Sequence, residues 1–490
     1  MQNIHQLNSD TRHKQTTPTV EPGTKLEYEI GPSTRFDFAG QNLTPYGGLL
    51  PVATMLDKLG FRELVAQYLR VRRIPRAMST YQFVLAMVLG MYIGFARLSQ
   101  LRFVALDPML RGIVKIAGLP PQCTFWRFLA SWHGSVSQQL VHLQEQMRKR
   151  VWAAAHARFQ QITLDTDTTV HTLYGNQMGG RVSYAPQKKG ARSYQPIFTF
   201  LAETREYLAG ELRNGDRPSG PQIAAHLRRV LSGVQDGARE LRARADSGFY
   251  CWHAVQVYQE YDCRFIMVAR KTARLVDRLK TVEWKPSPQT DADAESDFQY
   301  QPEGWEKPFR FVALRFPKPP QGQPFQHQPG RAEQYQLFET AAYLYRVFVT
   351  NLEGPVYRLV RFYNGRCASE NLIKEANNDA GMTTHPYYRF DMNQNHFQLV
   401  MLAYNLNCWL ALFHRHDHAG TASLRHTTLA TARLRFLFVA ARLWRHAGRV
   451  GISYSDQYED QTGLTQLMQR LRRIRLRDGI FAPVIAHALT

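Results

Sequence analysis

The chain has 490 residues but only five cysteines, and no two of them form a CxxC pair. Scattered cysteines in an odd number argue against a disulfide framework and a zinc ribbon, and they indicate a reducing compartment. The sequence also has no GxxxxGK[ST] phosphate loop, which argues against nucleotide hydrolysis and a nucleotide cofactor. It has no GxSxG elbow either, which argues against a hydrolase of that class.

Long apolar runs are missing as well. Residues 1–24 are polar and contain no apolar core of a signal peptide. The longest apolar run, Phe83 to Ala96, is shorter than the roughly 20 residues that a membrane-spanning helix needs, and it stops at Arg97. We therefore expect a buried helix there, no membrane partner and a cytoplasmic location.

Acidic residues are few relative to basic ones. Lysine and arginine number 61 against 40 aspartates and glutamates, giving a net charge of +21. The apolar share of 44% and the aromatic share of 12% are ample for buried cores. An excess of positive charge this large favours a polyanionic partner, because each phosphate that the protein neutralises releases counterions. The alternative on charge alone is a merely basic soluble protein.

Changes of pattern along the chain divide it into six segments. The spacing of apolar residues is helical before about residue 157, alternates between strand and helix after it, and is interrupted by a stretch rich in Pro, Gln, Asp and Glu. The predicted segments are a flexible arm (1–40), a helical region (41–157), the first part of an α/β core (158–270), a β-rich insertion (271–343), the second part of the core (344–392) and a basic helical region (393–490).

Residues 110–132 could form a helix-turn-helix. Gly118 to Pro121 would be the break, Thr124 could cap the second helix, and Arg127 would be exposed on it. The second helix would turn its apolar residues inward and leave three polar positions exposed: Gln122, Arg127 and His133. An ordinary helix pair explains the pattern at least as well as a base-reading helix.

Three acidic residues stand out by their context. Asp165 ends an apolar strand pattern, Asp246 ends another, and Glu370 lies on a predicted helix after the insertion. Three converging carboxylates would repel one another unless cations lay between them, and Mg²⁺ suits oxygen ligands and phosphate. Two such ions about 3.5–4 Å apart could activate a water or a 3′-hydroxyl for phosphoryl transfer. Asp167 shares the strand face of Asp165. We prefer Asp165 as the first ligand because the apolar run leads directly into it.

The predicted helix around Glu370 carries further polar groups at helical spacing. Tyr363, Arg366, Glu370 and Lys374 fall at i, i+3, i+7 and i+11, which places them along one face. An arginine one turn before a metal-bound glutamate can hold a DNA phosphate, and Tyr363 could hydrogen-bond a phosphate too. Taken alone, an arginine and glutamate four residues apart usually form a surface ion pair of little energy.

Together these motifs resemble the insertion-sequence DDE transposases. Asp165, Asp246 (81 residues on) and Glu370 (124 further) resemble their catalytic triad, and Tyr363-x-x-Arg366-x-x-x-Glu370 resembles the Tyr-Arg-Glu-Lys signature of the branch with a β-rich insertion before the glutamate. The local strings LDTDTT, RADSGF and YNGRCASENLIKE support the resemblance, which covers roughly residues 45–445. One departure is the family's lysine position, which is Asn377 here, with Lys374 one turn earlier as a possible substitute.

The resemblance implies a fold, an activity and partners. It implies a ribonuclease H-like α/β core with a β-rich insertion, flanked by N-terminal and C-terminal helical regions. It implies metal-dependent cleavage and strand transfer with two Mg²⁺ (or Mn²⁺) ions per site. The DNA partners would be terminal inverted repeats and target DNA, which a homodimer would hold together. The setting would be a bacterial cytoplasm, at the nucleoid.

Other residues have two interpretations each. Trp305 could stack on a flipped base, although local packing is the commoner role. The cluster around His414, His416, Asp417 and His418 lacks a matching ligand pair for zinc. Basic residues could contact phosphate or form solvated faces; they are Lys188, Lys189, Arg192, Arg442, Arg445, Arg449, Arg472, Arg473 and Arg475.

Two other functions compete with an active transposase. A catalytically inactive DNA-binding protein derived from a transposase would keep the fold without cutting. A nuclease on the same fold would cut DNA without joining it. The intact set of three acids favours an active enzyme over the first, and the long insertion and helical flanks favour a transposase over the second.

Overall fold

The computed structural model describes residues 30–71, 78–182, 188, 190–318, 338–340, 342–414 and 427–475. Residues 1–41 form one unit, and the rest of the chain forms one compact unit. Most of the predicted arm 1–40 therefore lies outside the described residues, as do Lys189, His416, Asp417 and His418. Of the first unit, residues 31–34 form a turn in which Thr34 N donates to Gly31 O at 3.0 Å.

Helices occupy the first part of the second unit, as the apolar spacing predicts. In chain order they are α1 (Leu49–Lys58), α2 (Phe61–Tyr68), α3 (Thr80–Ile93), the 3-10 helix η1 (Leu98–Val104), α4 (Pro108–Val114), α5 (Gln122–Ala130) and α6 (Ser135–Ala154). Ser79 and Gln82 form a capping box at the start of α3, an arrangement that satisfies otherwise unpaired backbone N–H groups. Residues Phe83 to Ile93 of α3 are buried throughout, which agrees with the interpretation of a core helix.

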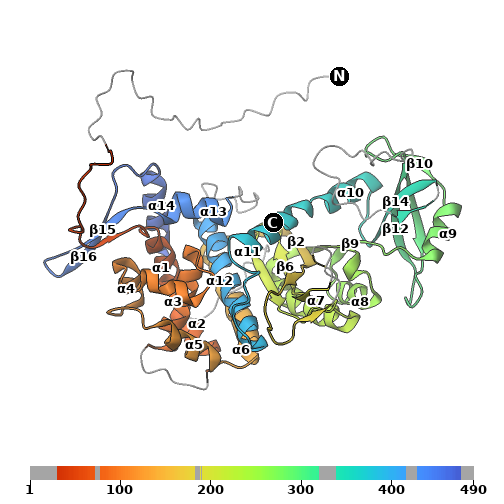
Figure 1. Ribbon diagram of the computed structural model, residues 1–490. Coiled ribbons are helices and arrows are strands. Elements are labelled where there is room, and N and C mark those ends of the chain that lie inside the picture. The colour runs from red at the N-terminus through yellow and green to blue at the C-terminus, as the bar shows by residue number, and fades with distance from the viewer. Residues whose placement is uncertain are drawn as a thin grey trace, which may run out of the picture. The chain divides into compact units, whose positions relative to one another are not determined.

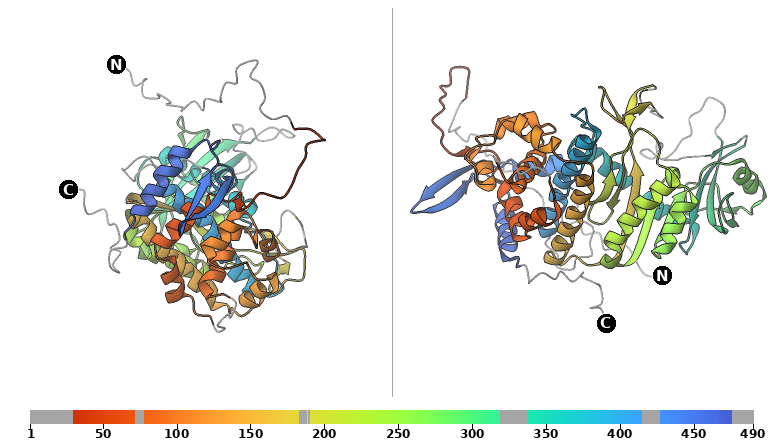
Figure 2. Two further views of the ribbon diagram at one scale, coloured as in Figure 1. Left: turned by 90° about the vertical axis from the view of Figure 1, so that its left-hand side faces the viewer. Right: turned by 90° about the horizontal axis from the view of Figure 1, so that it is seen from below.

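A long helix links these helices to the sheet. α12 (Phe390–His414) packs against α3, α6 and β7 (Tyr207–Glu211). In Figures 1 and 2 it lies between the N-terminal helices and the sheet. The amide of Asn405 accepts from Tyr207 N at 2.9 Å and donates to Tyr207 O at 2.8 Å. These bonds satisfy backbone groups on the edge strand that would otherwise lack partners.

One sheet of ten strands crosses the unit. Its order is β10-β11-β12-β14-β9-β8-β2-β6-β7, and β13 pairs with β14. β2 is parallel to β8, and β8 to β9, whereas β6 and β7 run antiparallel to their neighbours. The strands not yet bounded are β2 (Phe159–Thr168), β6 (Ile197–Leu201), β8 (Ala238–Ala245), β9 (Arg264–Val268), β10 (Lys285–Pro286), β11 (Ala294–Tyr300), β12 (Phe309–Pro317), β13 (Phe338–Glu339) and β14 (Tyr343–Thr350).

The two faces of this sheet bury different clusters. On β9, Phe265 and Met267 join the main core, whereas Ile266 and Val268 join a second core, as the alternation of side chains along a strand requires. Helices α7 (Gly220–Val234) and α8 (Trp252–Glu260) contribute to the main core. Helix α10 (Val356–Asn364) contributes to the second core, and α11 (Cys367–Asn378) follows it directly.

The segment 271–343, expected as a β-rich insertion, contains α9 (Ala273–Thr281), β10 to β13 and the first residue of β14 among its described residues. Residues 319–337 and 341 of it are outside the described part. β14 lies antiparallel to β9, so these strands continue the same sheet. The segment therefore extends the sheet beyond β9 instead of forming a sheet of its own.

The basic C-terminal region departs from the prediction of a helical segment. α13 (Leu429–Ala432), the π-helix η5 (Arg433–Leu437) and α14 (Gln461–Arg473) are helical, but β15 (Ala441–His446) and β16 (Arg449–Tyr454) form an antiparallel hairpin. β1 (Leu43–Thr44) adds a third strand to it. Arg442, Arg445 and Arg449 therefore lie on strands.

The physical reason for this difference is a two-residue turn. Ala447 and Gly448 both have positive φ values, 47° and 76°, which is the backbone that joins two strands tightly. All six arginines that we singled out in this region are exposed.

Smaller elements surround the central sheet. β3 (His171–Thr172), β4 (Arg181–Val182) and β5 (Arg192–Tyr194) form a three-stranded sheet next to the end of β2. The 3-10 turns η2 (Gln235–Gly237) and η3 (Ser247–Phe249) flank β8.

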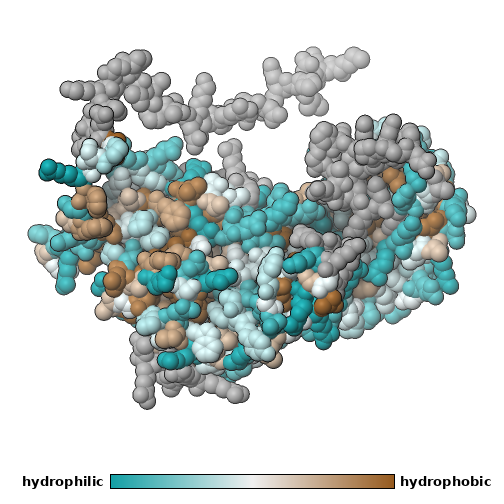
Figure 3. All heavy atoms as spheres, in the orientation of Figure 1, coloured by the Kyte–Doolittle hydropathy of each residue, from teal (hydrophilic) through white to brown (hydrophobic). Residues whose placement is uncertain are grey.

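The described helices were also compared with the length and hydropathy of a membrane span. No single one is long and apolar enough to cross a membrane, although the pair α3 and η1, bent by 86°, passes by length and composition. On the surface, apolar residues gather in Figure 3 over the part of the visible face that the N-terminal helices occupy.

A candidate carboxylate centre

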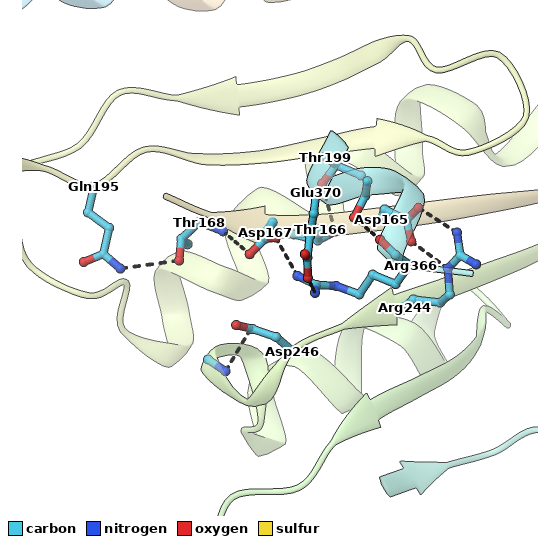
Figure 4. Close-up of polar contacts among 12 residues, drawn as sticks. Asp165, Thr166, Asp167, Thr168, Gln195, Thr199, Arg244, Asp246, Arg366 and Glu370 are labelled. Carbon is cyan, nitrogen blue, oxygen red and sulfur yellow. Dashed lines mark hydrogen bonds and ion pairs between the residues drawn. The ribbon is translucent and has the colours of Figure 1, made fainter. Parts of the chain in front are cut away.

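The register of two parallel strands decides which acids meet. β2 and β8 pair Asp165 with Arg244 and Thr166 with Ala245. One step further along both strands, Asp167 comes level with Asp246. Because parallel neighbours in register share a face, Asp165 lies beside Arg244, and Asp167 is directed toward the end of β8 that carries Asp246 (Figure 4).

Asp165 is fully engaged in a buried ion pair. Its side chain is 1% exposed, and Arg244 donates to it twice, from Nε to Oδ1 and from Nη2 to Oδ2, both at 2.7 Å. Arg244 also donates from Nη1 to the carbonyl of Phe362 at 3.0 Å, and its guanidinium lies 5.2 Å from the centroid of the Phe362 ring. The pair therefore joins β2, β8 and α10, and it uses both oxygens of the carboxylate.

Asp167 lies in a different environment. Its Oδ2 is 2.6 Å from Nη2 of Arg366, and its Oδ1 accepts from Thr168 N at 2.8 Å. Burial, together with the negative charges of Asp246 and Glu370, raises the pKa of Asp167 to about 7, although Arg366 and the Thr168 hydrogen bond oppose the rise. A carboxyl group with this pKa exchanges readily between its two protonation states near neutral pH, and such groups gather at functional sites.

Asp246 caps the turn that follows β8. Its Oδ1 accepts from Gly248 N at 2.9 Å. A side chain added at Gly248 would approach Asp246 Oδ1 to 2.9 Å, so the glycine leaves room for the carboxylate. The string RADSGF thus combines an alternating strand, an acid at its carboxyl end and a tight turn that orients the acid.

Arg366 lies at the junction of α10 and α11 and is buried. Besides its contact with Asp167, its Nη1 is 3.9 Å from Oε1 of Glu370. Burial lowers the pKa of Arg366, but the charge of Asp167 above all, with those of Asp246 and Asp165, raises it above its ordinary value. The guanidinium is thus a fixed cation among the acids, as Figure 4 shows.

Glu370 and Lys374 follow on α11 as the spacing predicts. The Glu370 side chain is 36% exposed, and Lys374 is exposed one turn later. Asn377, at the family's lysine position, is half-buried, and its Oδ1 is enclosed by protein. Of these two positions on α11, Lys374 carries the accessible positive charge.

The three remaining predicted site residues fall in different surroundings. Tyr363 is buried beside Phe348, with ring centroids 4.8 Å apart, and burial raises its pKa to about 12. Trp305 is 8% exposed and packs among Tyr250, Trp252 and Phe309. A base could stack on it only if this aromatic cluster opened, and the packing interpretation accounts for it.

Arg127 is exposed on α5 as predicted, but Trp126 is not on the buried side of that helix: 46% of it is exposed. The helix begins at Gln122, and its N-cap is Pro121, three residues before the predicted cap Thr124. Phe125, Phe128 and Leu129 alone form the buried face.

The site residue that our sequence prediction missed is Arg244. The string Arg244-Ala245-Asp246 places the arginine two residues before the aspartate, hence on the same strand face. This spacing can be read from the sequence, but it does not identify the partner of Arg244 until the register between β2 and β8 is known.

The donor set has the chemistry of a site for an oxygen-preferring divalent cation. Across the described ranges, no three His, Cys, Asp or Glu side chains converge closely enough to hold an ion as they stand. Arg366 explains this arrangement, because its guanidinium lies between Asp167 and Glu370.

Comparison with known proteins gives a match to a family and similarity to solved structures. The family model described as "Transposase DDE domain group 1" matches residues 27–476. No curated protein matches the chain. Among solved structures, the chain is similar to a piggyBac transposase synaptic complex with hairpin DNA, with 10% identity, a TM-score of 0.39, and coverage of 88% of this chain and 86% of that one.

Proposed function

The chain belongs to the family of DDE transposases, and on that premise we propose that it binds the terminal inverted repeats of an insertion sequence, cuts the DNA there and joins the freed ends to target DNA. The observation that carries the proposal is the strand register that brings Asp167 level with Asp246 beside Glu370. The buried Arg366 contacts both Asp167 and Glu370, and Lys374 is exposed one turn after Glu370 on α11.

The proposed core is ribonuclease H-like. Support comes from five strands in the order β7-β6-β2-β8-β9, of which β2, β6 and β7 form an antiparallel meander and β8 and β9 run parallel to β2. Ligands of such open α/β sheets bind outside the carboxyl ends of the parallel strands. Asp167 and Asp246 are at those ends, and we propose the predicted segments 158–270 and 344–392 as the two parts of this core.

We propose Asp167, and not Asp165, as the first catalytic carboxylate. Both carboxylate oxygens of Asp165 already accept hydrogen bonds from Arg244, and the side chain is buried. Detaching it would leave an unpaired charge inside the protein, which is costly. The negative charges of Asp246 and Glu370 instead both raise the pKa of Asp167. The triad would then be Asp167, Asp246 and Glu370, with Asp165 as a positioning residue that fixes β2 to β8.

The carboxylates fit a divalent cation by their oxygen donors, and we propose two Mg²⁺ or Mn²⁺ ions per site. Such cations supply activation of the attacking water or 3′-hydroxyl and stabilisation of the leaving oxygen. Asp167, Asp246 and Glu370 would hold them. The roles of the neighbouring basic residues follow from their charge. Arg366 can exchange its carboxylate partners for a phosphate of bound DNA. Lys374 can contact the DNA backbone beside that phosphate.

The basic residues outside the site suit the same partner. Arg127 on α5 and the exposed arginines of the β15–β16 hairpin and of α14 present positive charge where DNA backbone could bind. We propose that the helical region 41–157 recognises the repeat ends and that two copies of the chain hold two ends together.

A cleavage assay tests the proposal. The substrate is a labelled plasmid that carries the DNA flanking this coding sequence on both sides, and the cation is Mg²⁺. We expect the wild type to cut at the repeat ends and to transfer them to a second plasmid. Asp167→Asn, Asp246→Asn and Glu370→Gln should bind the DNA and lose cleavage, by about a thousandfold or more for a residue that acts in the chemical step.

Each other outcome favours a different function. Cleavage without transfer would favour the nuclease, and binding without cleavage by the wild type would favour the inactive DNA-binding protein. If a folded Asp165→Asn loses cleavage while Asp167→Asn keeps it, the assignment of the first carboxylate is wrong.

A further inference from the structure

A cleft of about 460 Å³ has none of the three acids among its lining residues. Three segments line it: Arg97 to Ser99 at the start of η1, Gln122 and Trp126 on α5, and the loop Pro386 to Arg389 with Met392 of α12. Gln122 and Trp126 belong to the segment 110–132, for which a helix-turn-helix was one of two interpretations.

The cleft is lined by two large aromatic side chains that remain exposed. Trp126 is 46% exposed and Tyr388 is 67% exposed. Single exposed aromatics are common and need no explanation, but two of them lining one concavity provide flat apolar surfaces for a planar ligand. Base–aromatic stacking of this kind is how proteins hold unpaired nucleotides.

The inner surface of the cleft adds an apolar floor and a buried hydroxyl. Leu98, Tyr387 and Met392 are all buried. The hydroxyl of Tyr387 has no hydrogen-bond partner among the described residues, and burial raises its pKa, so that it stays protonated. An unpartnered buried hydroxyl costs free energy, and a small shift of the Tyr387 side chain that brought it to the polar edge of a ligand would relieve that cost.

The rim of the cleft is polar and positive. Arg97 and Gln122 are exposed, and Arg97 takes part in no ion pair within the described part of the chain. An amide offers a donor and an acceptor side by side, which matches the edge of a base. The guanidinium of Arg97 matches a phosphate. No acidic residue is among the lining residues.

The wall of the cleft is held in place before any ligand enters. Arg389 donates from Nη1 to the carbonyl of Ala130, the last residue of α5, at 2.9 Å, and from Nε to Asp391 at 3.0 Å. Asn393 exchanges two hydrogen bonds with the backbone of Tyr387. The loop that carries Tyr387 and Tyr388 is thereby fixed to both α5 and α12, and a rigid site loses little entropy on binding.

The same loop also reaches the surroundings of the carboxylates. His385, one residue before the cleft-lining loop, hydrogen-bonds to His171 at 2.9 Å, and Met178 N donates to Tyr388 O at 2.8 Å. His171 follows β2 by three residues, so a DNA strand passing the carboxyl end of β2 lies next to the segment that leads to the cleft.

We propose that this cleft holds one unstacked base of bound DNA, with the ring between Trp126 and Tyr388 and the phosphate at Arg97. The proposal rests on the proposed function only in that the ligand belongs to DNA. It concerns recognition of a base and includes no chemical step.

Binding of two matched duplexes tests it. Both carry the same sequence, but one has a single extrahelical 2-aminopurine, and neither contains a repeat end. We expect the wild type to bind the duplex with the extrahelical base about tenfold more tightly, as the loss of one base–aromatic stack would predict. On binding, the 2-aminopurine fluorescence should be quenched. Trp126→Ala and Tyr388→Ala should abolish both the preference and the quenching, without weakening binding to the paired duplex.

Two further variants serve as controls. Trp126→Tyr keeps an aromatic ring and should keep most of the preference. Trp444→Ala removes a tryptophan of similar exposure, 43%, on the β15–β16 hairpin, and should leave the preference intact. Equal binding of both duplexes by the wild type, or a preference that survives in folded Trp126→Ala and Tyr388→Ala, overturns the proposal.

A competition experiment distinguishes a base that belongs to a DNA strand from a free nucleotide. Deoxynucleoside monophosphates at millimolar concentration should compete weakly, because they lack the adjoining strand. Strong competition would identify a site for free nucleotides and would overturn the assignment to DNA. Asp246→Asn and Glu370→Gln should retain the full preference, so a failure of catalysis and a failure of base binding give different results.

Discussion

The guanidinium of Arg244 donates two hydrogen bonds, each 2.7 Å long, to the carboxylate of Asp165 on the neighbouring parallel strand. This pair separates two aspartates that the sequence makes equivalent. Asp165 and Asp167 occupy the same face of β2, but the first is bound to a structural partner and the second lies among the other acids. We therefore expect Asp165 to stabilise the fold and Asp167 to act in catalysis, and separate substitutions can test the two roles.

Loss of Asp165 should reduce stability more than loss of Asp167. Asp165→Asn leaves the buried Arg244 without its charge partner, and breaking one side of a buried pair costs about 3–5 kcal/mol. Urea unfolding of metal-free protein measures this difference. Asp167→Asn should cost less, because Glu370 and Asp246 still offset the charge of Arg366 and because burial and like charges already disfavour the ionised form of Asp167.

A double variant serves as the control for that comparison. Asp165→Leu combined with Arg244→Met removes both charges and should recover much of the lost stability, since apolar replacement of a buried pair is often neutral. Equal destabilisation by Asp165→Asn and Asp167→Asn would contradict the division of roles.

Arg366 should compete with metal for the carboxylates. In the free protein its guanidinium is 2.6 Å from Asp167 and 3.9 Å from Glu370. Arg366→Gln removes that internal cation, so we expect Mn²⁺ to bind the DNA-free protein roughly tenfold more tightly, which corresponds to the loss of one charge-assisted hydrogen bond of about 1.5–3 kcal/mol. Isothermal titration calorimetry measures the affinity. DNA cleavage should nevertheless fall, because the phosphate contact is lost.

The matched control is Arg361→Gln, one helical turn before the site on α10, where the arginine is exposed. It removes the same charge from the protein without touching the carboxylates. If the Mn²⁺ affinity is unchanged in Arg366→Gln, or rises equally in Arg361→Gln, the Arg366 guanidinium does not compete with the metal ion for the carboxylates.

Lys374 should take the place of the family's lysine in contacting DNA. It is exposed on α11 in the turn after Glu370, whereas Asn377 is half-buried with its Oδ1 enclosed by protein. Lys374→Gln should weaken DNA binding uniformly across sequences and reduce the slope of log affinity against log salt by about 1. Lys280→Gln on the exposed surface of α9 is the control for charge. Rescue of Lys374→Gln by Asn377→Lys would show that the two positions are interchangeable after all.

Much of the core could be predicted from the sequence because its signals are local. The strands at residues 161–167, 197–202, 241–245 and 265–269 follow apolar alternation, and the structure has β2, β6, β8 and β9 at these places. The helix that carries Arg366 and Glu370 follows from spacing alone, apart from its break at Gly365. That glycine leaves room for Arg244, whose Nη1 would be 2.4 Å from an added side-chain carbon.

The rest depended on contacts between distant residues. Strand register is set by packing across the whole sheet, so no local pattern could choose between Asp165 and Asp167. The C-terminal hairpin was missed because its turn is Ala447-Gly448, without the Asn-Gly or Asp-Gly signal, and because its strands carry arginines that also suit a helix. Its third strand, β1, lies almost the whole chain away.

Glu375 should make stability depend on pH. It lies on α11, the helix that carries Glu370, and its Oε1 accepts from Leu429 N at 2.8 Å at the start of α13. Burial raises the pKa of Glu375 from 4.5 to about 7. Between these values the folded protein holds a proton that the unfolded chain has released. The stability linked to that proton is therefore fully present below pH 4.5 and is lost as the pH rises through about 7.

The variant Glu375→Gln is neutral at every pH and can still accept from Leu429. Relative to wild type, it should be similarly stable near pH 4.5 and more stable above pH 7, by about 1–3 kcal/mol. Urea unfolding at both ends of this range measures the difference, with Glu353→Gln as a control at an exposed position. A gain of the same size at acidic and alkaline pH would place its cause in packing and not in protonation. A gain confined to the alkaline side would show that burial of the ionised Glu375 carboxylate is what lowers the stability of the wild type above pH 7.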